Sequence, residues 1–131
     1  MPKKRTKPLF AVTDYFGNLV ECSEETWVSH ILDPVDGHPQ MAGYENLVQD
    51  VLKNPYEVRV STQHQTGVAF ISPPGTGPSP EGLRALVNFA NAHYEKGSTT
   101  GNLMTAYPVD WVRYGNPRLG KIIKAATKHG R

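Results

Sequence analysis

The sequence predicts an α+β domain in which N-terminal helices pack on one face of an antiparallel β-sheet. Three observations support this class. A short strand pair opens the chain, helical apolar periodicity follows up to residue 53, and period-two apolar patterns recur from residue 57 onward. Helices and antiparallel strands that occupy separate parts of a chain are typical of α+β folds. With 131 residues, the chain has room for one domain with one core.

The first elements expected are a hairpin and a helix. Residues 9–13 and 19–22 are apolar-rich, and a Gly-Asn pair in the segment between them favours a turn. Ser23 follows as a candidate N-cap, because its hydroxyl can accept a hydrogen bond from a free backbone N–H of the first helical turn. The spacing of the next apolar residues predicts a short helix over about residues 24–32.

The second helix is expected over about residues 41–53, where the helical periodicity is clearest. Asn54-Pro55 should end it, since the residue before a proline disfavours the helical conformation. Its apolar residues recur at intervals of three and four, and they are Tyr44, Leu47, Val48, Val51 and Leu52.

Strands are expected in the second half of the chain. Apolar and polar residues alternate around 58–60, and residues 68–71 would return as the neighbouring strand before a Pro/Gly-rich loop over 72–80. Residues 83–94 fit a helix and a strand equally well. Residues 102–109 have the pattern of a further strand.

The charge of the chain is concentrated at its ends. Residues 1–8 form a basic arm with no acid, which we expect to be flexible, and residues 9–131 form the single domain. Residues 8–110 hold all 12 acids and four of the 14 bases. The segment from Trp111 to the end is again basic, and Asn116-Pro117 can cap a C-terminal helix within it. Basic ends beside an acidic body can steer and hold a polyanion.

Several classes of protein are disfavoured by the sequence. No apolar run approaches the roughly 20 residues that a membrane helix needs. The lone Cys22 cannot form an internal disulfide, which fits a cytoplasmic protein, and a small buried hydrophobe is its expected role. The chain has no P-loop, GxGxxG, HExxH or GxSxG motif, so the sequence predicts neither a cofactor nor a metal.

The remaining residues suit metal-independent cleavage of a phosphodiester. That reaction needs a base for the 2′-OH, an acid for the 5′-oxygen and donors for the charged phosphorane. His30 is the first candidate for acid or base, at the edge of the first helix, and His38 before the second helix is the next. Arg59, on the polar side of its strand, is the candidate to stabilise the phosphorane.

Candidate substrate-binding residues lie later in the chain and on the second helix. Thr105 and Tyr107 are two residues apart, so they share one face of a strand and could hold a phosphate and a base. Glu45 flanks the apolar stripe of its helix, where it could orient a histidine. Lys121 and Lys124 would lie on the solvent side of the C-terminal helix, where they could contact RNA.

The order of several short motifs resembles a known family. The motifs are Trp-Val-Ser-His-Ile at residues 27–31, His-Pro-Gln-Met at 38–41, Leu-Lys-Asn-Pro at 52–55 and Thr-Ala-Tyr at 105–107. In this order they resemble the phage-associated nuclease-like domains grouped with barnase, the EndoU endoribonucleases, the tRNA-cleaving colicins and the RelE toxins. The resemblance covers roughly residues 9–110.

That resemblance carries expectations about fold and function. It implies N-terminal helices on an antiparallel sheet, and it favours a strand over residues 83–90. It places His30 and His38 in the acid/base region and Thr105 and Tyr107 on the phosphate-contacting strand. A tRNA or mRNA substrate, and an antitoxin or immunity protein as partner, would follow for an endoribonuclease of phage or toxin type.

Two other functions remain open from the sequence. One is a binding module of the same fold that holds nucleic acid through its basic ends and cuts nothing. The other is a protein-interaction domain, such as an inhibitor, without affinity for nucleic acid. Loss of cleavage in a His30→Ala variant with intact salt-sensitive binding would separate an enzyme from a binding module.

Overall fold

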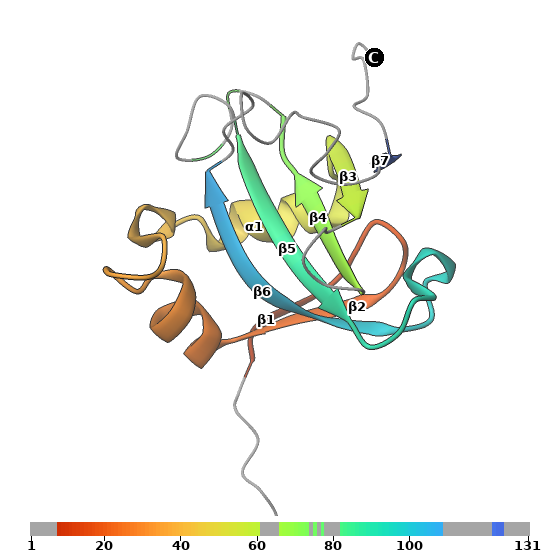
Figure 1. The fold of residues 1–131 in the computed structure, drawn as a ribbon, viewed down its shortest axis with the longest axis horizontal. Helices are drawn as coiled ribbons and strands as arrows, with labels where there is room; N and C mark the ends of the chain where they lie inside the picture. The colour runs from red at the N-terminus through yellow and green to blue at the C-terminus, as the bar shows by residue number, and fades with distance from the viewer. Residues whose placement is uncertain are drawn as a thin grey trace, which may run out of the picture.

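The chain folds as an α+β domain around one mixed sheet (Figure 1). The computed structural model describes residues 8–60, 66–73, 75, 77 and 82–108, together with the backbone of residues 122–124. Within these residues the sheet has seven strands in the order β1-β2-β6-β5-β4-β3-β7. The strands are β1 (Pro8–Thr13), β2 (Leu19–Ser23), β3 (Glu57–Val60), β4 (Gly67–Ile71), β5 (Leu83–Phe89), β6 (Thr100–Pro108) and β7 (Ile122–Lys124).

The N-terminal part of the chain has the predicted hairpin and helix start. Strands β1 and β2 pair antiparallel, and Val12 lies opposite Val20. The Ser23 hydroxyl accepts a hydrogen bond from the backbone N–H of Thr26 at 3.0 Å, as expected of a cap. The π-helical segment η1 (Thr26–Ile31) then buries Trp27 and Ile31 in the core.

The predicted antiparallel sheet is wrong at one pairing, because β2 runs parallel to β6. Strands β3 to β6 form the expected antiparallel meander, and the N-terminal hairpin adds to its last strand. The two paired strands are about 80 residues apart, with Val20 opposite Gly101. Local apolar patterns indicate which residues form strands. They carry no information on whether a strand pairs parallel or antiparallel with a partner about 80 residues away.

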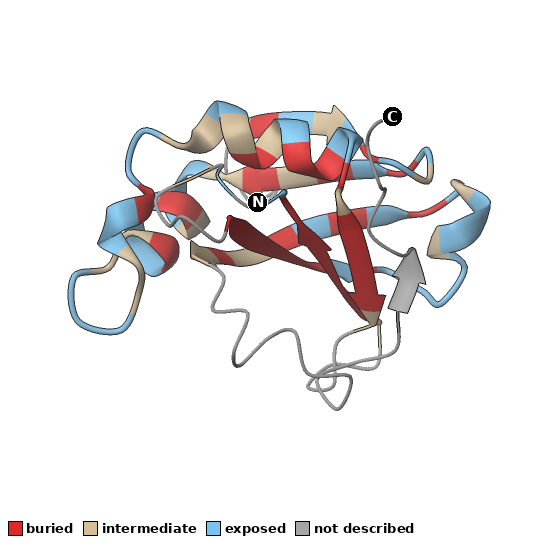
Figure 2. Cartoon of the chain, turned by 90° about the horizontal axis from the view of Figure 1, so that it is seen from above, coloured by how far each residue is buried: buried red, intermediate tan, exposed pale blue. Residues whose placement is uncertain are grey.

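Helix α1 (Glu45–Lys53) begins four residues later than the sequence predicts. The single 3₁₀ turn η2 (Pro39–Met41) comes first, and Gly43 then has a φ of +89°, which a right-handed helix cannot contain. The helix ends before Asn54-Pro55 as predicted. Figures 1 and 2 show α1 across one face of the sheet, where its buried residues Val48, Val51 and Leu52 join the core.

Residues 83–89 form the strand β5, so the alternative helix there is wrong. The segment is buried on both of its faces except at Asn88, and it lies between β4 and β6 (Figure 1). A strand buried on both faces has a continuous apolar run instead of a clear alternation, which explains why the pattern alone was ambiguous. The strand favoured by the family resemblance is confirmed for these residues.

The structure describes only a short part of the chain after residue 108. Residues 122–124 form β7, which pairs antiparallel with β3, so the expected C-terminal helix is wrong at these three positions. Taken alone, the spacing of apolar residues in this segment fits a helix. Pairing with β3 instead favours the extended conformation of a strand. Lys121 and residues 1–7 of the basic arm lie outside the described residues, whereas Pro8, the last residue of the expected arm, is already part of β1. Only the backbone of Lys124 is described.

Two further expectations concern the cysteine and the membrane. Cys22 is 1% exposed, and burial raises the pKa of its thiol to about 12, which confirms its role as a small buried hydrophobe. Among the described residues, none of the helices has the length and apolar character required to cross a bilayer.

Candidate functional site

An open hollow lies between η1, the loop that follows it and β6. Its volume is about 470 Å³. His30 is exposed on η1, and Thr105 is half-buried on β6, so two residues singled out from the sequence border the same space. The full lining consists of Ser29, His30, Asp33, Asp36, Met104 and Thr105.

A β-bulge explains why adjacent residues of β6 both face the hollow. Leu86 of β5 pairs with Thr105, whereas the next residue, Val87, pairs with Leu103. Met104 is therefore the extra residue on β6, and the alternation of side chains is interrupted there. As a result, Met104 and Thr105 line the hollow together.

The loop after η1 is closed by tight backbone contacts at Gly37. Its N–H donates to the Asp33 carbonyl at 2.9 Å, and the next N–H, of His38, donates to the Ile31 carbonyl at 2.5 Å. A Cβ at Gly37 would lie 2.3 Å from the His30 carbonyl oxygen, which leaves no room for a side chain. The absence of a side chain at this glycine therefore lets the loop fold back and bring His38 close to η1.

His38 packs against Tyr107 of β6. Their ring centroids are 4.9 Å apart, and the ring planes are tilted by 32°. Burial lowers the pKa of His38 below its ordinary value of 6.5, because desolvation disfavours the charged imidazolium. A neutral imidazole at pH 7 has one nitrogen that can accept a proton.

Arg84 is a site residue that the sequence reasoning missed. It lies directly opposite Tyr107 in the β5–β6 register. Its guanidinium donates a hydrogen bond to the Tyr107 hydroxyl, and its Cζ is 5.5 Å from the centroid of that ring. Arg84 is 8% exposed, so its positive charge lies in a largely buried position beside Tyr107. A single arginine in the otherwise apolar run 83–87 was the available signal.

Four of the sequence-predicted residues thus gather around β6. His30 and Thr105 share the hollow, and His38 contacts Tyr107. Thr105 and Tyr107 lie on the same face of the sheet, spaced about 7 Å along the strand. The pairing rows confirm this, since Thr105 lies opposite Leu86 and Tyr107 opposite Arg84.

Arg59 lies away from this group. It is on the same sheet face as Thr105, but two strands separate β3 from β6 in the sheet order. With strands about 4.8 Å apart, the two residues are separated by roughly 14 Å across the sheet. Arg59 is 5% exposed and forms an ion pair with Glu57 on its own strand. Arg84, not Arg59, is therefore the arginine that contacts the β6 residues.

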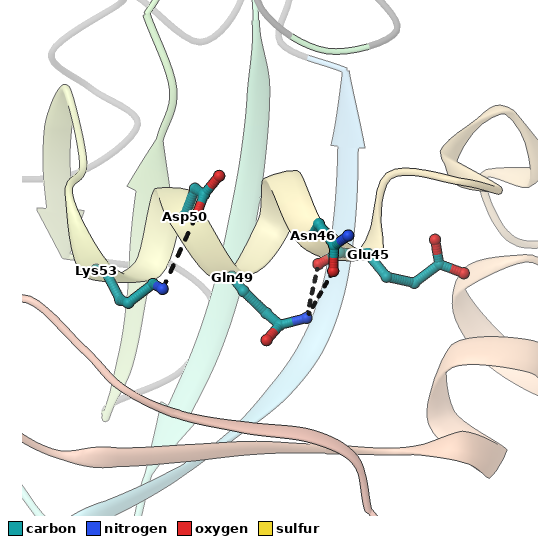
Figure 3. A network of polar contacts seen from close by, with 5 residues as sticks. All are labelled: Glu45, Asn46, Gln49, Asp50 and Lys53. Carbon is teal, nitrogen blue, oxygen red and sulfur yellow. Dashed lines mark hydrogen bonds and ion pairs between the residues drawn. The ribbon is translucent and has the colours of Figure 1, made fainter.

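Glu45, the residue expected to orient a histidine, is in the first turn of α1 (Figure 3). Its backbone carbonyl accepts a hydrogen bond from the Gln49 side chain at 3.3 Å. The polar contacts drawn in Figure 3 remain within the helix, where Lys53 lies 3.9 Å from Asp50. Among the described residues, no hydrogen bond or ion pair joins Glu45 to His30 or His38.

The described residues contain no group of three or more histidine, cysteine or acidic side chains placed to hold a metal ion. Comparison with known proteins gives no match to this chain among family models, curated proteins or solved structures.

Proposed function

We propose that this domain is a metal-independent endoribonuclease of phage or toxin type that acts on RNA in the cytoplasm. The observation that carries the proposal is the grouping of two histidines, two hydroxyl-bearing side chains and a buried arginine around β6. These are the groups that transesterification by a ribose 2′-OH requires. The order of the sequence motifs, which resembles that of phage-associated nuclease domains, supports the same activity.

His38 is the general base in this proposal. Its lowered pKa keeps the imidazole neutral at pH 7, and the neutral ring can take the proton of the 2′-OH. The neighbouring Tyr107 ring limits the orientations open to the imidazole. The 2′-oxygen then attacks the phosphorus atom of the same nucleotide.

His30 is the general acid. It is exposed at the hollow, so a bound nucleotide can reach it without a rearrangement of the core. As the bond between phosphorus and the 5′-oxygen breaks, His30 gives that oxygen a proton. The products are a 2′,3′-cyclic phosphate and a free 5′-hydroxyl, so protons and bonds balance without a co-reactant.

Arg84, Tyr107 and Thr105 stabilise the charged phosphorane. Arg84 polarises the Tyr107 hydroxyl through its hydrogen bond, and the positive charge beside β6 favours the dianionic transition state. Thr105 supplies a second hydroxyl on the same sheet face. Donors fixed in a β-sheet need no reorganisation as charge develops.

The test is cleavage of total RNA by the purified chain in excess EDTA. We expect discrete fragments that end in 2′,3′-cyclic phosphate. His30→Ala and His38→Ala should each lower the rate by about 10² to 10⁴-fold, the usual contribution of a general acid or base. His93→Ala is the matched control, because His93 is exposed in the β5–β6 connection and does not line the hollow.

Two results would contradict the proposal. Intact RNA across a range of pH and salt, with binding that weakens as salt rises, would instead indicate a nucleic-acid-binding module. Equal cleavage by wild type and both histidine variants would indicate a contaminating nuclease. An antitoxin or immunity protein that inhibits this domain should bind over the hollow and abolish cleavage.

A further inference from the structure

We infer that two copies of this chain associate by antiparallel pairing of their β1 strands. The pairing joins the sheets of the two copies into one continuous sheet across a two-fold axis. This assembly does not depend on the endoribonuclease activity proposed above, and it can be measured without RNA.

Strand β1 lies at one edge of the sheet. It is the first strand in the sheet order, so β2 is its one neighbour among the described strands. The outer side of an edge strand presents backbone N–H and C=O groups that can pair with another chain, and proteins commonly protect such an edge with charged side chains. The six residues of β1, Pro8–Thr13, contain no charged side chain. The edge is therefore open to a further strand.

The register of the hairpin identifies the backbone groups that point away from β2. The N–H of Asp14 donates to the Asn18 carbonyl at 2.8 Å, so these two residues form a hydrogen-bonded pair. Hydrogen-bonded and non-hydrogen-bonded pairs alternate along an antiparallel ladder. Ala11 and Thr13 therefore direct their N–H and C=O groups to the outer side of β1. Among the described residues, neither takes part in a backbone hydrogen bond outside the ladder.

These two residues determine the register of a symmetric pair. With the two-fold axis at Val12, Ala11 of one copy lies opposite Thr13 of the other, and the reverse pair lies on the other side of the axis. Each such pair exchanges two hydrogen bonds. The same register brings Leu9 of one copy level with Tyr15 of the other. Leu9 is 39% exposed and Tyr15 is 47% exposed, so pairing also removes apolar surface from water.

Both ends of the pairing surface are closed within each copy. Pro8 has no N–H, and the register shift between Pro8 and Phe10 makes Leu9 the extra residue of a β-bulge. At the other end, the N–H of Tyr15 donates to the Leu52 carbonyl at 2.8 Å. The pair is therefore short. A two-fold contact uses the same edge of both copies, so the assembly stops at a dimer.

The charge of the domain favours a second copy at this edge over other surfaces. Residues 8–110 hold 12 acids and four bases, so most surfaces of two copies repel each other. The acid on the neighbouring strand is Glu21, and three strand spacings, roughly 14 Å, would separate the two copies of it. Asp14 follows β1, but it is 6% exposed, and its carboxylate accepts the N–H groups of Phe16 and Asn18 in its own turn.

The experiment is sedimentation equilibrium of the full chain from about 1 µM to about 1 mM. We expect a monomer–dimer equilibrium that is micromolar or weaker, because a short strand pair buries less than the roughly 1,200 Å² of a standard interface. The dimer should persist at about 1 M salt, since contacts between uncharged strands are not screened. Attraction between a basic arm and an acidic body would instead disappear there.

Two substitutions test the contacts. Ala11→Pro removes an outward N–H from each copy, and an edge strand tolerates proline where its N–H faces solvent. Loss of two of the four hydrogen bonds should raise the dissociation constant about tenfold or more. Leu9→Ser should also weaken the dimer. Val35→Ser is its matched control, because Val35 is an apolar side chain 84% exposed in the loop after η1.

A pair of charge variants tests the register and replaces Ala11→Pro if that chain does not fold. Ala11 and Thr13 are both exposed, so Ala11→Lys and Thr13→Glu should each leave the melting temperature nearly unchanged. Each variant alone brings like charges together near the two-fold axis and should dimerise less than the wild type. An equal mixture places opposite charges in directly opposed positions and should dimerise more tightly than either variant alone.

Four results would overturn the inference. They are a monomer at every concentration, a dimer that is lost at about 1 M salt, a dimer that both Ala11→Pro and Leu9→Ser leave unchanged, and a mixture of the charge variants no tighter than the separate chains. A salt-resistant dimer that is weakened by the β1 substitutions and restored in the mixture would support β1 pairing, whether or not the chain cleaves RNA.

Discussion

At the scale of single residues, the two histidines differ in their surroundings. His38 is half-buried against Tyr107, whereas His30 is exposed at the hollow. Desolvation lowers the pKa of His38, so its neutral form persists to a lower pH than that of a solvated histidine. Burial against Tyr107 is the basis for giving the base to His38, and exposure at the hollow is the basis for giving the acid to His30.

The pH dependence of the reaction should reflect the lowered pKa of His38. Protonated His38 cannot accept the 2′-OH proton, so kcat/KM should fall as the pH drops through a pKa below 6.5. The unfolded chain would take up the proton first, and folding stability should therefore also fall as the pH drops below 6.5. A proton NMR titration of the His38 ring is the measurement. A midpoint at or above 6.5 would contradict both expectations.

Gly37 should be intolerant of any side chain. A Cβ there would lie 2.3 Å from the His30 carbonyl oxygen, 2.6 Å from that of Ile31 and 2.7 Å from the Asp33 nitrogen, and all three are backbone atoms. Gly37→Ala should therefore lower the free energy of unfolding by about 1–3 kcal/mol, as overpacking does, and should reduce cleavage further by displacing His30. Urea denaturation and the RNA assay measure the two effects.

Gly43→Ala is the control for Gly37→Ala. Gly43 has a φ of +89°, but no atom lies within 4 Å of its added Cβ. Backbone strain of about 1–2 kcal/mol is expected there without displacement of the histidines. If both variants retained equal activity per folded molecule, the Gly37 contacts would not position His30.

Residue types in the sequence indicated some members of the candidate site and missed others. Histidine, threonine and tyrosine near predicted element ends stood out because they can transfer protons or donate to phosphate. Arg84 did not stand out, since its role depends on the neighbour that the β5–β6 register gives it. Arg59 was chosen by the same residue-type argument, and only the strand order shows its distance from β6.

At the scale of elements, a buried polar network joins the β1–β2 turn to the β5–β6 connection. Asn18 is fully buried, and its side chain donates to the Tyr94 carbonyl at 2.7 Å. The same side chain accepts a hydrogen bond from the backbone N–H of Thr99 at 3.1 Å. These bonds fix the hairpin next to the strand with which it pairs in parallel.

Asn18→Ala should leave two backbone groups without their partner, the buried Thr99 N–H and the part-buried Tyr94 carbonyl. Each unsatisfied group costs about 1–3 kcal/mol, so the free energy of unfolding should fall by about 2–4 kcal/mol. The exposed Asn46 on α1 provides the control, and Asn46→Ala should change stability by less than about 0.5 kcal/mol. Urea denaturation of both variants tests this. Equal stability of the two would mean that the network does not hold the hairpin.

The predictability of each element follows from the range of the interactions that form it. The first hairpin, η1 and the end of α1 are specified by local turn, cap and proline signals, and their positions were predicted. The parallel β2–β6 pairing and the strand at 122–124 depend on contacts with distant segments, and they were not. The structure of 83–89 lay between these cases, because burial on both faces removed its local signal.

At the scale of the whole molecule, the charge is unevenly distributed along the chain. Residues 1–7 of the arm have four bases and no acid, whereas residues 8–110 contain all 12 acids. The described core begins after the arm, and its first buried residue is Phe10. Attraction of RNA and stability of the fold should therefore depend on different parts of the chain.

Removal of residues 1–7 should weaken RNA binding without destabilising the fold. Each cation that neutralises a phosphate of single-stranded RNA changes the slope of log K against log salt concentration by about 0.7. Loss of the four bases should thus reduce the magnitude of the slope by up to about 3, with an unchanged melting temperature. The variant Lys53→Gln controls for the loss of a single exposed charge elsewhere.

The measurements are RNA titrations at several salt concentrations and thermal unfolding of the full chain and the chain that lacks residues 1–7. An unchanged slope would show that the arm does not contact RNA, and a lower melting temperature would show that the arm contributes to the fold.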